Sequence, residues 1–457
     1  MNLKWTLHVE NFARVREADI QIAPLVCFIG DNNSGKSYLM SLLWGLLKNS
    51  DLFYNNKPNE TATYHECREW ISAHIDKRAG VIDEDSEQIY VRWFNELLAQ
   101  NKDRLMRRTF NTDLIQLGDM RITDFSRMKK LSVKITSAEE LRVMRTTRLS
   151  GEDSHDKIGI EIPADKETFD AIWWKAGVFV AWNLLMLGLT DIVPFDKNIT
   201  GSIYLPASRT GFLLARREIA LKSIAIRYSL ADTENAVQET LTAPYIQFIQ
   251  LINSFKDTPK FFNDVRKAPL YQFLKDNIIS GDVESKLDGQ VIKYIPNDLN
   301  EQEFPMSISS SVVTETASLL LLLAAQTEFK SLIIEEPEAH LHPDLQKKIA
   351  QLIVRFVHSG IPVWITTHSD IILQHFNNMI KLSNRPAEER EALLEKFNYT
   401  DDDLLTADEI ALYQFNRYEQ HTAVQKLNSG KYGFVIPSFN DAIQSLLNEI
   451  FAFQGDD

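Results

Sequence analysis

Cysteine is almost absent from this sequence, which has only Cys27 and Cys67 among 457 residues. Two cysteines cannot build a disulfide framework or, by themselves, a zinc site. Cys27 also stands in an apolar run that predicts a buried strand. Because disulfide-stabilised proteins belong to oxidising compartments, the scarcity of cysteine favours a reducing, cytoplasmic setting.

Positive charge is also scarce, since 49 Lys and Arg face 63 Asp and Glu, a formal net charge of −14 at pH 7. A chain this acidic does not coat nucleic acid with its whole surface, although a local basic patch is compatible with it. Residues 101–150 are the exception, with twelve Lys or Arg and six Asp or Glu. We interpret them as a solvated strand face rather than a contact patch for nucleic acid or an acidic partner, because aromatic residues do not alternate with the charges.

Long apolar runs suited to a membrane are missing as well. Residues 1–5 lack the apolar core of a signal peptide. Residues 171–189 have the length of a spanning helix, but Lys175 and Asn183 interrupt them and acidic residues flank them. We therefore expect a buried helix of a large domain and no membrane contact.

The remaining composition is that of an ordinary globular protein, with 44% hydrophobic and 25% charged residues and enough length for two or three domains. Hydrophobic periodicity gives a coarse prediction of secondary structure. It predicts two or three strands over 1–29, helices over 38–48, 67–76 and 87–98, a small antiparallel sheet from 131–135, 141–143 and 158–162, and helices broken at Pro244, Pro259 and Pro269.

The stretch with the clearest chemistry is 30–37, GDNNSGKS, between the apolar run 25–29 and a helical pattern over 38–47. It matches G-x-x-x-x-G-K-[ST] in the strand–loop–helix context that the motif needs. The glycines let the backbone approach a polyphosphate, and the helix N-terminus presents positive potential to it. Lys36 is expected to reach the β- and γ-phosphates, and Ser37 to bind Mg²⁺. The predicted nucleotide-binding residues are Gly30, Asn32, Asn33, Ser34, Gly35, Lys36, Ser37 and Tyr38.

A second motif is 331–343, SLIIEEPEAHLHP, in which an apolar strand ends in two adjacent carboxylates. Neighbouring residues of a strand point to opposite sides, so the pair can divide the work. Glu335 is expected to hold Mg²⁺, and Glu336 to act as the catalytic base that polarises the attacking water.

Polar residues follow two further predicted strands. His368 comes after the apolar run 361–367, where a histidine can contact the γ-phosphate or the attacking water. Arg209 follows 202–205, and its position suits either a phosphate or subunit contact or an ordinary surface arginine. The serines of 307–311 precede an apolar helix and can face an anion.

The order GDNNSGKS, SISSSVVTE, LIIEEPEAHLHP, TTHS resembles the ABC/SMC-like ATPases, specifically the AAA-family, overcoming-lysogenization-defect-like ATPases of bacterial anti-phage defence. The resemblance covers roughly 1–50 and 200–380. It implies an α/β fold of the P-loop NTPase class, ABC/SMC type: a mixed sheet with helices on both faces, an N-terminal antiparallel β subdomain and an inserted α+β or helical subdomain. Five segments are expected: 1–50, the N-terminal ATPase lobe; 51–200, the inserted subdomain; 201–306, a return strand and helical lever; 307–380, the C-terminal ATPase lobe; and 381–457, a C-terminal α/β extension.

The family also implies a homo-oligomer, at least a dimer with a hexamer as a further option, in which two copies sandwich ATP and Mg²⁺. One copy presents Lys36 and the other its signature serines, Ser309, Ser310 and Ser311, while Glu336 and His368 act as base and switch histidine. The sequence departs from the family where Glu335 replaces an aspartate and Val312 a glycine. Gln116 is a candidate for the Q-loop glutamine.

The leading functional hypothesis is an ATPase sensor or scaffold that controls a partner effector nuclease, Toprim- or HNH-type, encoded nearby and triggered by nucleic acid or a phage protein. This resembles the ATPase subunits of the PARIS and Septu systems. No nuclease motif is expected in the chain itself, because Asp401–Asp403 lie in a polar run without a matching Glu-Gly strand. The alternatives are a RecF/Rad50-like DNA-repair ATPase, against which the lack of long heptad arms counts, and a nucleotide-gated assembly subunit with negligible turnover.

Overall fold

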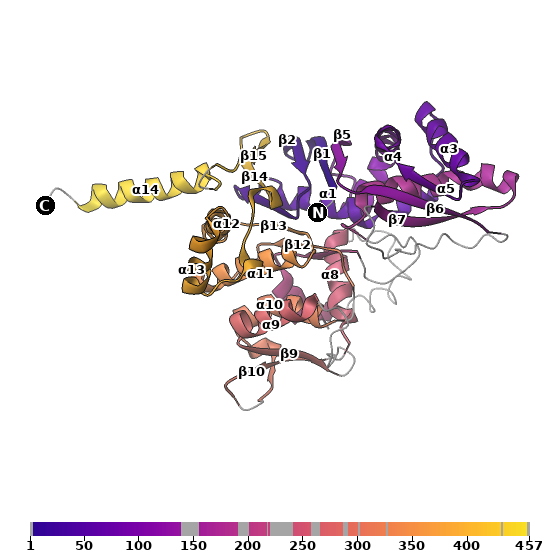
Figure 1. Ribbon diagram of the computed structural model, residues 1–457. Coiled ribbons are helices and arrows are strands. Elements are labelled where there is room, and N and C mark those ends of the chain that lie inside the picture. Colours follow the sequence, from indigo (N-terminus) through magenta and orange to yellow (C-terminus); the bar gives the residue numbers. More distant parts are fainter. Residues whose placement is uncertain are drawn as a thin grey trace, which may run out of the picture.

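A nine-stranded mixed sheet organises the chain (Figure 1), with the strand order β5-β1-β2-β15-β14-β3-β13-β12-β8. The computed structural model describes residues 3–138, 155–190, 201–216, 218–219, 241–256, 266–286, 291–299, 302–325, 328–430 and 433–454. The strands of this sheet are β1 (Leu3–Phe12), β2 (Val15–Gln21), β3 (Leu25–Gly30), β5 (Asp119–Arg127), β8 (Ser202–Leu205), β12 (Ser331–Glu335), β13 (Val363–Thr366), β14 (Ile410–Arg417) and β15 (Thr422–Leu427).

Five neighbouring strands, β14, β3, β13, β12 and β8, run parallel. Their residues are almost all buried, as expected for parallel strands covered on both faces. Ile365 pairs with Cys27 on one side and with Ile334 on the other, and Ile334 pairs with Leu205. The carboxyl ends of these strands therefore meet along one edge, where ligands bind in open parallel sheets.

The other end of the sheet is antiparallel, because β1 pairs with both β2 and β5. β15 connects the two ends, since it is antiparallel to β14 and parallel to β2. The strands predicted over 1–29 are confirmed as β1, β2 and β3. β14 and β15 bring residues from beyond position 400 into the middle of the sheet.

Helices cover both faces of the sheet. Val26 and Phe28 of β3 pack in one hydrophobic cluster with α1, α4 and α5, whereas Leu25, Cys27 and Ile29 pack in another with α10, α11 and α12, because successive strand residues face opposite sides. This arrangement, with the antiparallel N-terminal part, confirms the predicted fold class. The helices are α1 (Lys36–Lys48), α4 (Glu84–Phe110), α5 (Lys166–Met186), α10 (Ser311–Ala324), α11 (Pro343–His358) and α12 (Asp370–Ser383).

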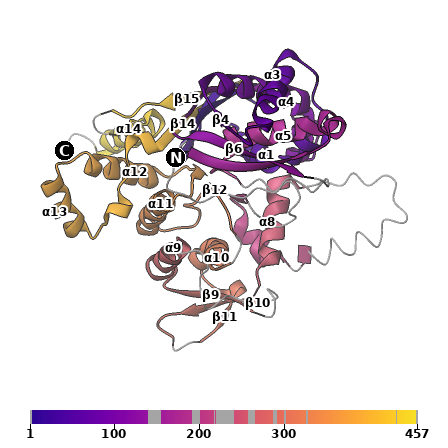
Figure 2. The same ribbon diagram turned by 45° about the vertical axis from the view of Figure 1, so that its right-hand side comes forward.

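Between α1 and β8 the chain forms a lobe with its own sheet, β4-β6-β7 (Figure 2). The predicted antiparallel pairing is wrong for β6 and β7, which run parallel, because alternation predicts the face of each residue and not the strand direction. The expected strand at 141–143 lies outside the described residues. The lobe also contains α2 (Asp51–Asn55), α3 (Ala62–Ile75), β4 (Ala79–Ile82), β6 (Lys130–Ala138) and β7 (His155–Pro163).

The apolar segment 171–189 coincides with α5, whose side chains are buried from Ala176 to Met186. The interpretation as a buried helix is confirmed. In the described ranges, no helix is long and apolar enough to cross a membrane. Asp165 starts α5 by accepting a hydrogen bond from the Thr168 backbone N–H, as N-cap residues do.

A second small sheet, β11-β10-β9, is antiparallel and lies next to α9 and α10 (Figure 2). Pro244 and Pro269 lie in the first turns of α8 and α9, where proline is tolerated. Pro259 lies outside the described residues. The elements of this part are α6 (Arg209–Leu214), α8 (Ala243–Ser254), α9 (Lys267–Leu274), β9 (Gly281–Lys286), β10 (Val291–Pro296) and β11 (Phe304–Pro305).

The C-terminal part adds α13 (Ala387–Phe397) and α14 (Pro437–Gln454) to the strands β14 and β15. Asp401–Asp403 form a short 3₁₀ helix in which Asp403 is buried and bonded to Arg355 Nε at 2.5 Å. α14 projects away from the rest of the molecule in Figure 1. The segment boundaries at 50, 200, 306 and 380 stay predictions.

Candidate nucleotide-binding site

The predicted phosphate loop connects β3 to α1, and glycine is required at both ends of it. Gly30 has φ +122°, and a Cβ there would lie 2.2 Å from the Phe415 carbonyl oxygen of β14. Gly35 has φ +97° and a Cβ there would lie 3.2 Å from a Val15 methyl group. Between them the side chains of Asn32 and Asn33 are exposed. The backbone thus reaches a conformation that a side chain would obstruct.

Lys36 begins α1 and turns back over the loop. Its Nζ donates to the carbonyl oxygens of Gly30 at 2.9 Å and Asp31 at 2.6 Å, and to Ser34 Oγ at 3.4 Å. Burial lowers the pKa of Lys36 to about 8, although the charges of Asp31 and nearby glutamates act in the opposite direction. A buried ammonium held by neutral carbonyls is prepared to exchange them for an anion. The next two residues, Ser37 and Tyr38, are exposed.

The two glutamates at the end of β12 occupy different environments. Glu335 is 2% exposed; its Oε2 accepts a hydrogen bond from the Ala207 N–H at 3.1 Å, and its Oε1 is buried without a hydrogen-bond partner among the described residues. Glu336 is half-buried, and its N–H donates to the Thr366 carbonyl oxygen at 2.9 Å. Glu336 has φ +42°, a left-handed conformation that is strained for a side chain of this size.

The free oxygen of Glu335 fits the predicted metal role. Buried carboxylate oxygens are rarely left without a partner, and those that are need a water, an ion or a ligand to complete them. A divalent cation with oxygen ligands would satisfy Glu335 Oε1, and the exposed hydroxyl of Ser37 stands at the start of α1. These residue types suit Mg²⁺ rather than a soft metal.

His368 follows β13, the strand between β3 and β12. Burial and the charge of Lys36 lower the pKa of His368, whereas Glu336 and Asp31 raise it. The imidazole, the Lys36 ammonium and the Glu336 carboxylate therefore interact electrostatically across one edge of the sheet. The structure brings these three predicted residues together, although their roles stay predictions.

Glu338 is a third carboxylate at the site, and it was not among the residues predicted from the sequence. Its Oε1 accepts the His368 backbone N–H at 2.6 Å, and its Oε2 is buried without a hydrogen-bond partner in the described ranges. Burial raises the pKa of Glu338, while hydrogen bonds from His368 and Thr367 act against that rise. Glu338 thus fixes the loop that carries the histidine. Its position two residues after Glu336 was the available signal.

Two tyrosines also border the glutamates. Burial raises the pKa of Tyr245 to about 12, and the charges of Glu335 and Glu336 add to that rise. Burial and the Glu335 charge raise the pKa of Tyr204 as well. Both phenols therefore stay protonated near neutral pH. They come from α8 and β8, and no motif in the sequence marks them.

Arg209 is buried, so the interpretation as an ordinary surface arginine is wrong, whereas the phosphate or subunit contact stays a prediction. It is 4% exposed, and its Nη1 and Nη2 donate to the carbonyl oxygens of Glu335 at 2.8 Å and Glu336 at 3.0 Å. The register that places β8 beside β12 brings the first turn of α6 against the end of β12. This pairing is long-range and could not be read from the local sequence.

The signature serines lie at the N-terminus of α10. Ser310 caps the helix by accepting a hydrogen bond from the Val313 N–H at 3.4 Å, and Ser309 Oγ donates to the Pro305 carbonyl at 3.2 Å. Ser310 and Ser311 are exposed. Within the described residues, no hydrogen bond joins these serines to the chain's own phosphate loop. Gln116, the Q-loop candidate, is exposed just before β5 and accepts a hydrogen bond from the Ala13 N–H through its carbonyl oxygen.

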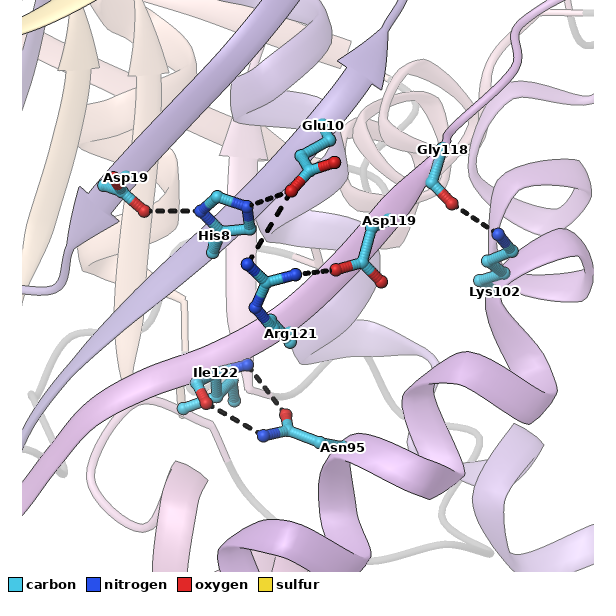
Figure 3. Close-up of polar contacts among 9 residues, drawn as sticks. All are labelled: His8, Glu10, Asp19, Asn95, Lys102, Gly118, Asp119, Arg121 and Ile122. Carbon is cyan, nitrogen blue, oxygen red and sulfur yellow. Dashed lines mark hydrogen bonds and ion pairs between the residues drawn. The ribbon is translucent and has the colours of Figure 1, made fainter.

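A separate charged cluster lies on β1, β2 and β5, at the antiparallel end of the sheet (Figure 3). His8 is 6% exposed, with Nδ1 2.7 Å from Asp19 Oδ1 and Nε2 2.9 Å from Glu10 Oε1. Burial alone would lower the pKa of His8, but the two carboxylates raise it above its usual value. His8 is close enough to Glu10 and Asp119, or to Glu17 and Asp19, to hold a metal ion with them, but both imidazole nitrogens are already engaged by Asp19 and Glu10.

Comparison with known proteins settles the family. The sequence profile of the AAA ATPase domain matches residues 1–373. The chain belongs to the AAA ATPase domain family. It is therefore an ATP-binding ATPase, as the phosphate loop and the carboxylates beside it indicate.

Several solved structures are similar to this chain, with TM-scores below 0.5. A crystal structure of the SMC head bound to the C-terminal winged-helix domain of ScpA is 11% identical, covers 93% of this chain and 97% of its own, and has a TM-score of 0.35. The SMC head domain of Thermotoga maritima is 10% identical, covers 94% and 100%, and has a TM-score of 0.34. An SMC head domain with an extended coiled coil, bound to the C-terminal domain of ScpA derived from Pyrococcus furiosus, is 11% identical. The match covers 97% of this chain and 98% of that chain, with a TM-score of 0.33. No curated protein matches the chain.

Proposed function

We propose that this ATPase is the sensor or scaffold subunit of a bacterial anti-phage defence complex, and that two copies clasp ATP between them to control a partner effector nuclease. The observation that supports the clasp concerns the serines at the start of α10. Lys36, Glu336 and His368 lie at one edge of the sheet, whereas Ser310 and Ser311 are exposed and, within the described residues, make no hydrogen bond to the chain's own phosphate loop. A second copy can supply these hydroxyls to the first copy's nucleotide.

In this mechanism each residue acts through its position. The Lys36 ammonium would leave the carbonyls of Gly30 and Asp31 and neutralise the β- and γ-phosphates. Glu336 would accept the proton of the attacking water, and His368 would contact the γ-phosphate side of the site. Ser37 and Glu335 would hold Mg²⁺, which neutralises charge that develops on the phosphates. Closure on ATP and reopening after hydrolysis would hold or release the partner.

The defence role draws on the sequence resemblance and on the chemistry of the chain. Asp403, part of the acidic run Asp401–Asp403, is buried in a bidentate pair with Arg355 and is not free to bind a metal. In the proposed complex the nuclease activity belongs to a partner protein. Nucleic acid or a phage protein would act as the trigger.

The DNA-repair alternative depends on the basic residues of 101–150, and among those that the structure describes the ion pairs of three arginines count against it. Arg107 pairs with Asp113, Arg108 with Asp51 and Arg127 with Asp156. Charges neutralised within the chain contribute little to phosphate binding. A salt-dependent DNA shift that disappears when Arg104, Arg107 and Arg108 are changed to alanine would favour the alternative.

The clasp is tested by trapping it. Glu336→Gln keeps the shape of the side chain but cannot accept a proton, so with Mg-ATP it should shift from monomer to closed dimer in analytical ultracentrifugation. Lys36→Ala combined with Glu336→Gln should abolish that shift and serves as the control. A trapped variant that stays monomeric at micromolar concentration would refute the two-subunit sandwich.

A further inference from the structure

Arg209 makes a set of buried hydrogen bonds that joins two parts of the molecule. Besides the carbonyl oxygens of Glu335 and Glu336, it reaches the carbonyl oxygen of Glu315, to which its Nε donates at 3.1 Å. Glu315 lies in the second turn of α10, the helix that begins with the signature serines. A planar guanidinium has enough donors in a fixed fork to bond three separate carbonyls. One side chain therefore connects the two glutamates at the end of β12 to α10.

An ion pair reinforces this connection. Glu315 is 2% exposed, with its Oε2 3.1 Å from Arg209 Nε, and its Oε1 lies 3.7 Å from His340 Nε2. Burial lowers the pKa of Arg209, and the negative charge of Glu315 is the first of the forces that oppose this. Removing either partner would leave a buried charge without compensation. α10 therefore cannot shift without disturbing Arg209.

The contact between Arg209 and Glu336 affects the direction in which the Glu336 side chain points. The Glu336 backbone is held at φ +42° by two hydrogen bonds: its N–H donates to the Thr366 carbonyl oxygen, and its carbonyl oxygen accepts from Arg209 Nη2. A strained conformation persists only where surrounding bonds determine it. A movement of Arg209 would release the carbonyl and let Glu336 turn away from the site.

We infer that Arg209 is a positioning residue that couples α10 to Glu336, so that contact between Ser309–Ser311 and a second subunit's nucleotide sets the orientation of the base at the chain's own site. The inference rests on the proposed two-subunit function and adds to it a route between the two nucleotide sites. The coupling element is a packed helix and one buried ion pair, which is a contiguous physical link.

Glu315→Gln and Arg209→Lys, alone and together, test the coupling. Glu315 makes no hydrogen bond to a predicted phosphate-loop residue within the described chain, yet its change to Gln should lower kcat at least about tenfold and leave the ATP dissociation constant within about threefold. Arg209→Lys should do the same. The double variant should be no slower than the slower single variant, because both changes break one link.

The exposed pair Arg385 and Glu389, 3.6 Å apart, provides the matched control. Arg385→Lys and Glu389→Gln should leave kcat unchanged. If Glu315→Gln keeps wild-type kcat, or if the Arg209 and Glu315 effects multiply, the coupling is overturned while the ATPase proposal stands. A lowered unfolding temperature with unchanged kcat would also overturn it. If Arg209→Lys fails to fold, the isosteric Glu315→Gln still decides. Failure of the proposed function itself would appear separately, as a Glu336→Gln variant that hydrolyses ATP normally.

Discussion

Charged side chains gather at both ends of the nine-stranded sheet, but they are paired at one end and partly unpaired at the other. At the antiparallel end His8 lies between Asp19 and Glu10, and Arg121 pairs with Asp119 (Figure 3). At the parallel end Glu335 Oε1 and Glu338 Oε2 are buried and lack hydrogen-bond partners among the described residues.

This difference separates charges that stabilise the fold from charges that await a ligand. In a hydrogen-bonded network the bonds offset the free energy of desolvating the charges. A buried carboxylate oxygen without a partner lowers the stability of the fold until a ligand binds it. The left-handed backbone of Glu336 adds strain at the same end. We therefore expect substitutions at the parallel end to affect nucleotide chemistry, and those at the antiparallel end to affect stability.

The largest expected effect is that of Lys36→Ala on ATP binding. Because Lys36 Nζ is the buried cation of the loop, its removal should weaken ATP binding by about a hundredfold or more, the contribution of roughly 3 kcal/mol for charge-assisted contacts to phosphate. Isothermal titration calorimetry measures this. Lys102→Ala, which removes the lysine that bonds Gly118 at the other end (Figure 3), should leave the affinity unchanged.

The second-largest effect is expected from Glu336→Gln on ATP turnover, because a general base contributes about a hundredfold or more to the rate. Phosphate release should fall by that factor while ATP affinity stays within a few-fold of wild type. Glu10→Gln, a matched change at the antiparallel end, should turn over ATP at the wild-type rate. Equal losses in both variants would erase the distinction between the two ends.

The sequence predicted the local parts of the site and missed the long-range ones. The phosphate loop was accessible because its glycines, Lys36 and flanking apolar run are contiguous, and such motifs carry their own context. The burial of Arg209 could not be predicted, because its partners Glu315 and Glu335 lie more than a hundred residues away in sequence. Hydrophobic periodicity does not indicate which distant backbone carbonyls a buried arginine will bond.

The order and direction of the strands could not be predicted from the sequence either. Alternation in β6 and β7 predicted strands correctly, but their parallel pairing depends on the path of the connecting chain. The placement of β14 beside β3 could not be inferred either, because its apolar residues would suit several positions in a sheet. The sequence therefore predicts elements and motifs better than it predicts neighbours.

A moderate effect is expected from pH on ATP binding. The pKa of Lys36 is lowered to about 8 by burial, and a bound polyphosphate would raise it again. Binding above pH 8 should therefore take up a proton, and the affinity should fall by up to about tenfold per pH unit there. Calorimetry in two buffers of different ionisation enthalpy measures the uptake. Zero proton uptake at pH 8.5 would show that the ammonium is not at the phosphates.

The smallest effect is expected at His8, in stability. Because the folded state raises the pKa of His8 above its usual 6.5, the protonated imidazole stabilises the fold fully below that value, and the contribution is lost as pH rises through the folded pKa. His8→Asn should lower the free energy of unfolding by about 1–2 kcal/mol at pH 5.5 and by less at pH 9. Urea titrations at both pH values measure this. A loss that grows with pH would contradict the assignment.

The position of β14 has a consequence for the order in which the molecule is made. Gly30 rests against the Phe415 carbonyl oxygen, and Asp31 accepts the Arg417 N–H at 3.0 Å. A ribosome has to translate nearly four hundred further codons after the phosphate loop before these contacts can exist. Until then β3 has at most one of its two neighbouring strands, because β13 is itself made only when translation reaches 363–366. A nascent or prematurely terminated chain would therefore lack the β14 side of the phosphate loop.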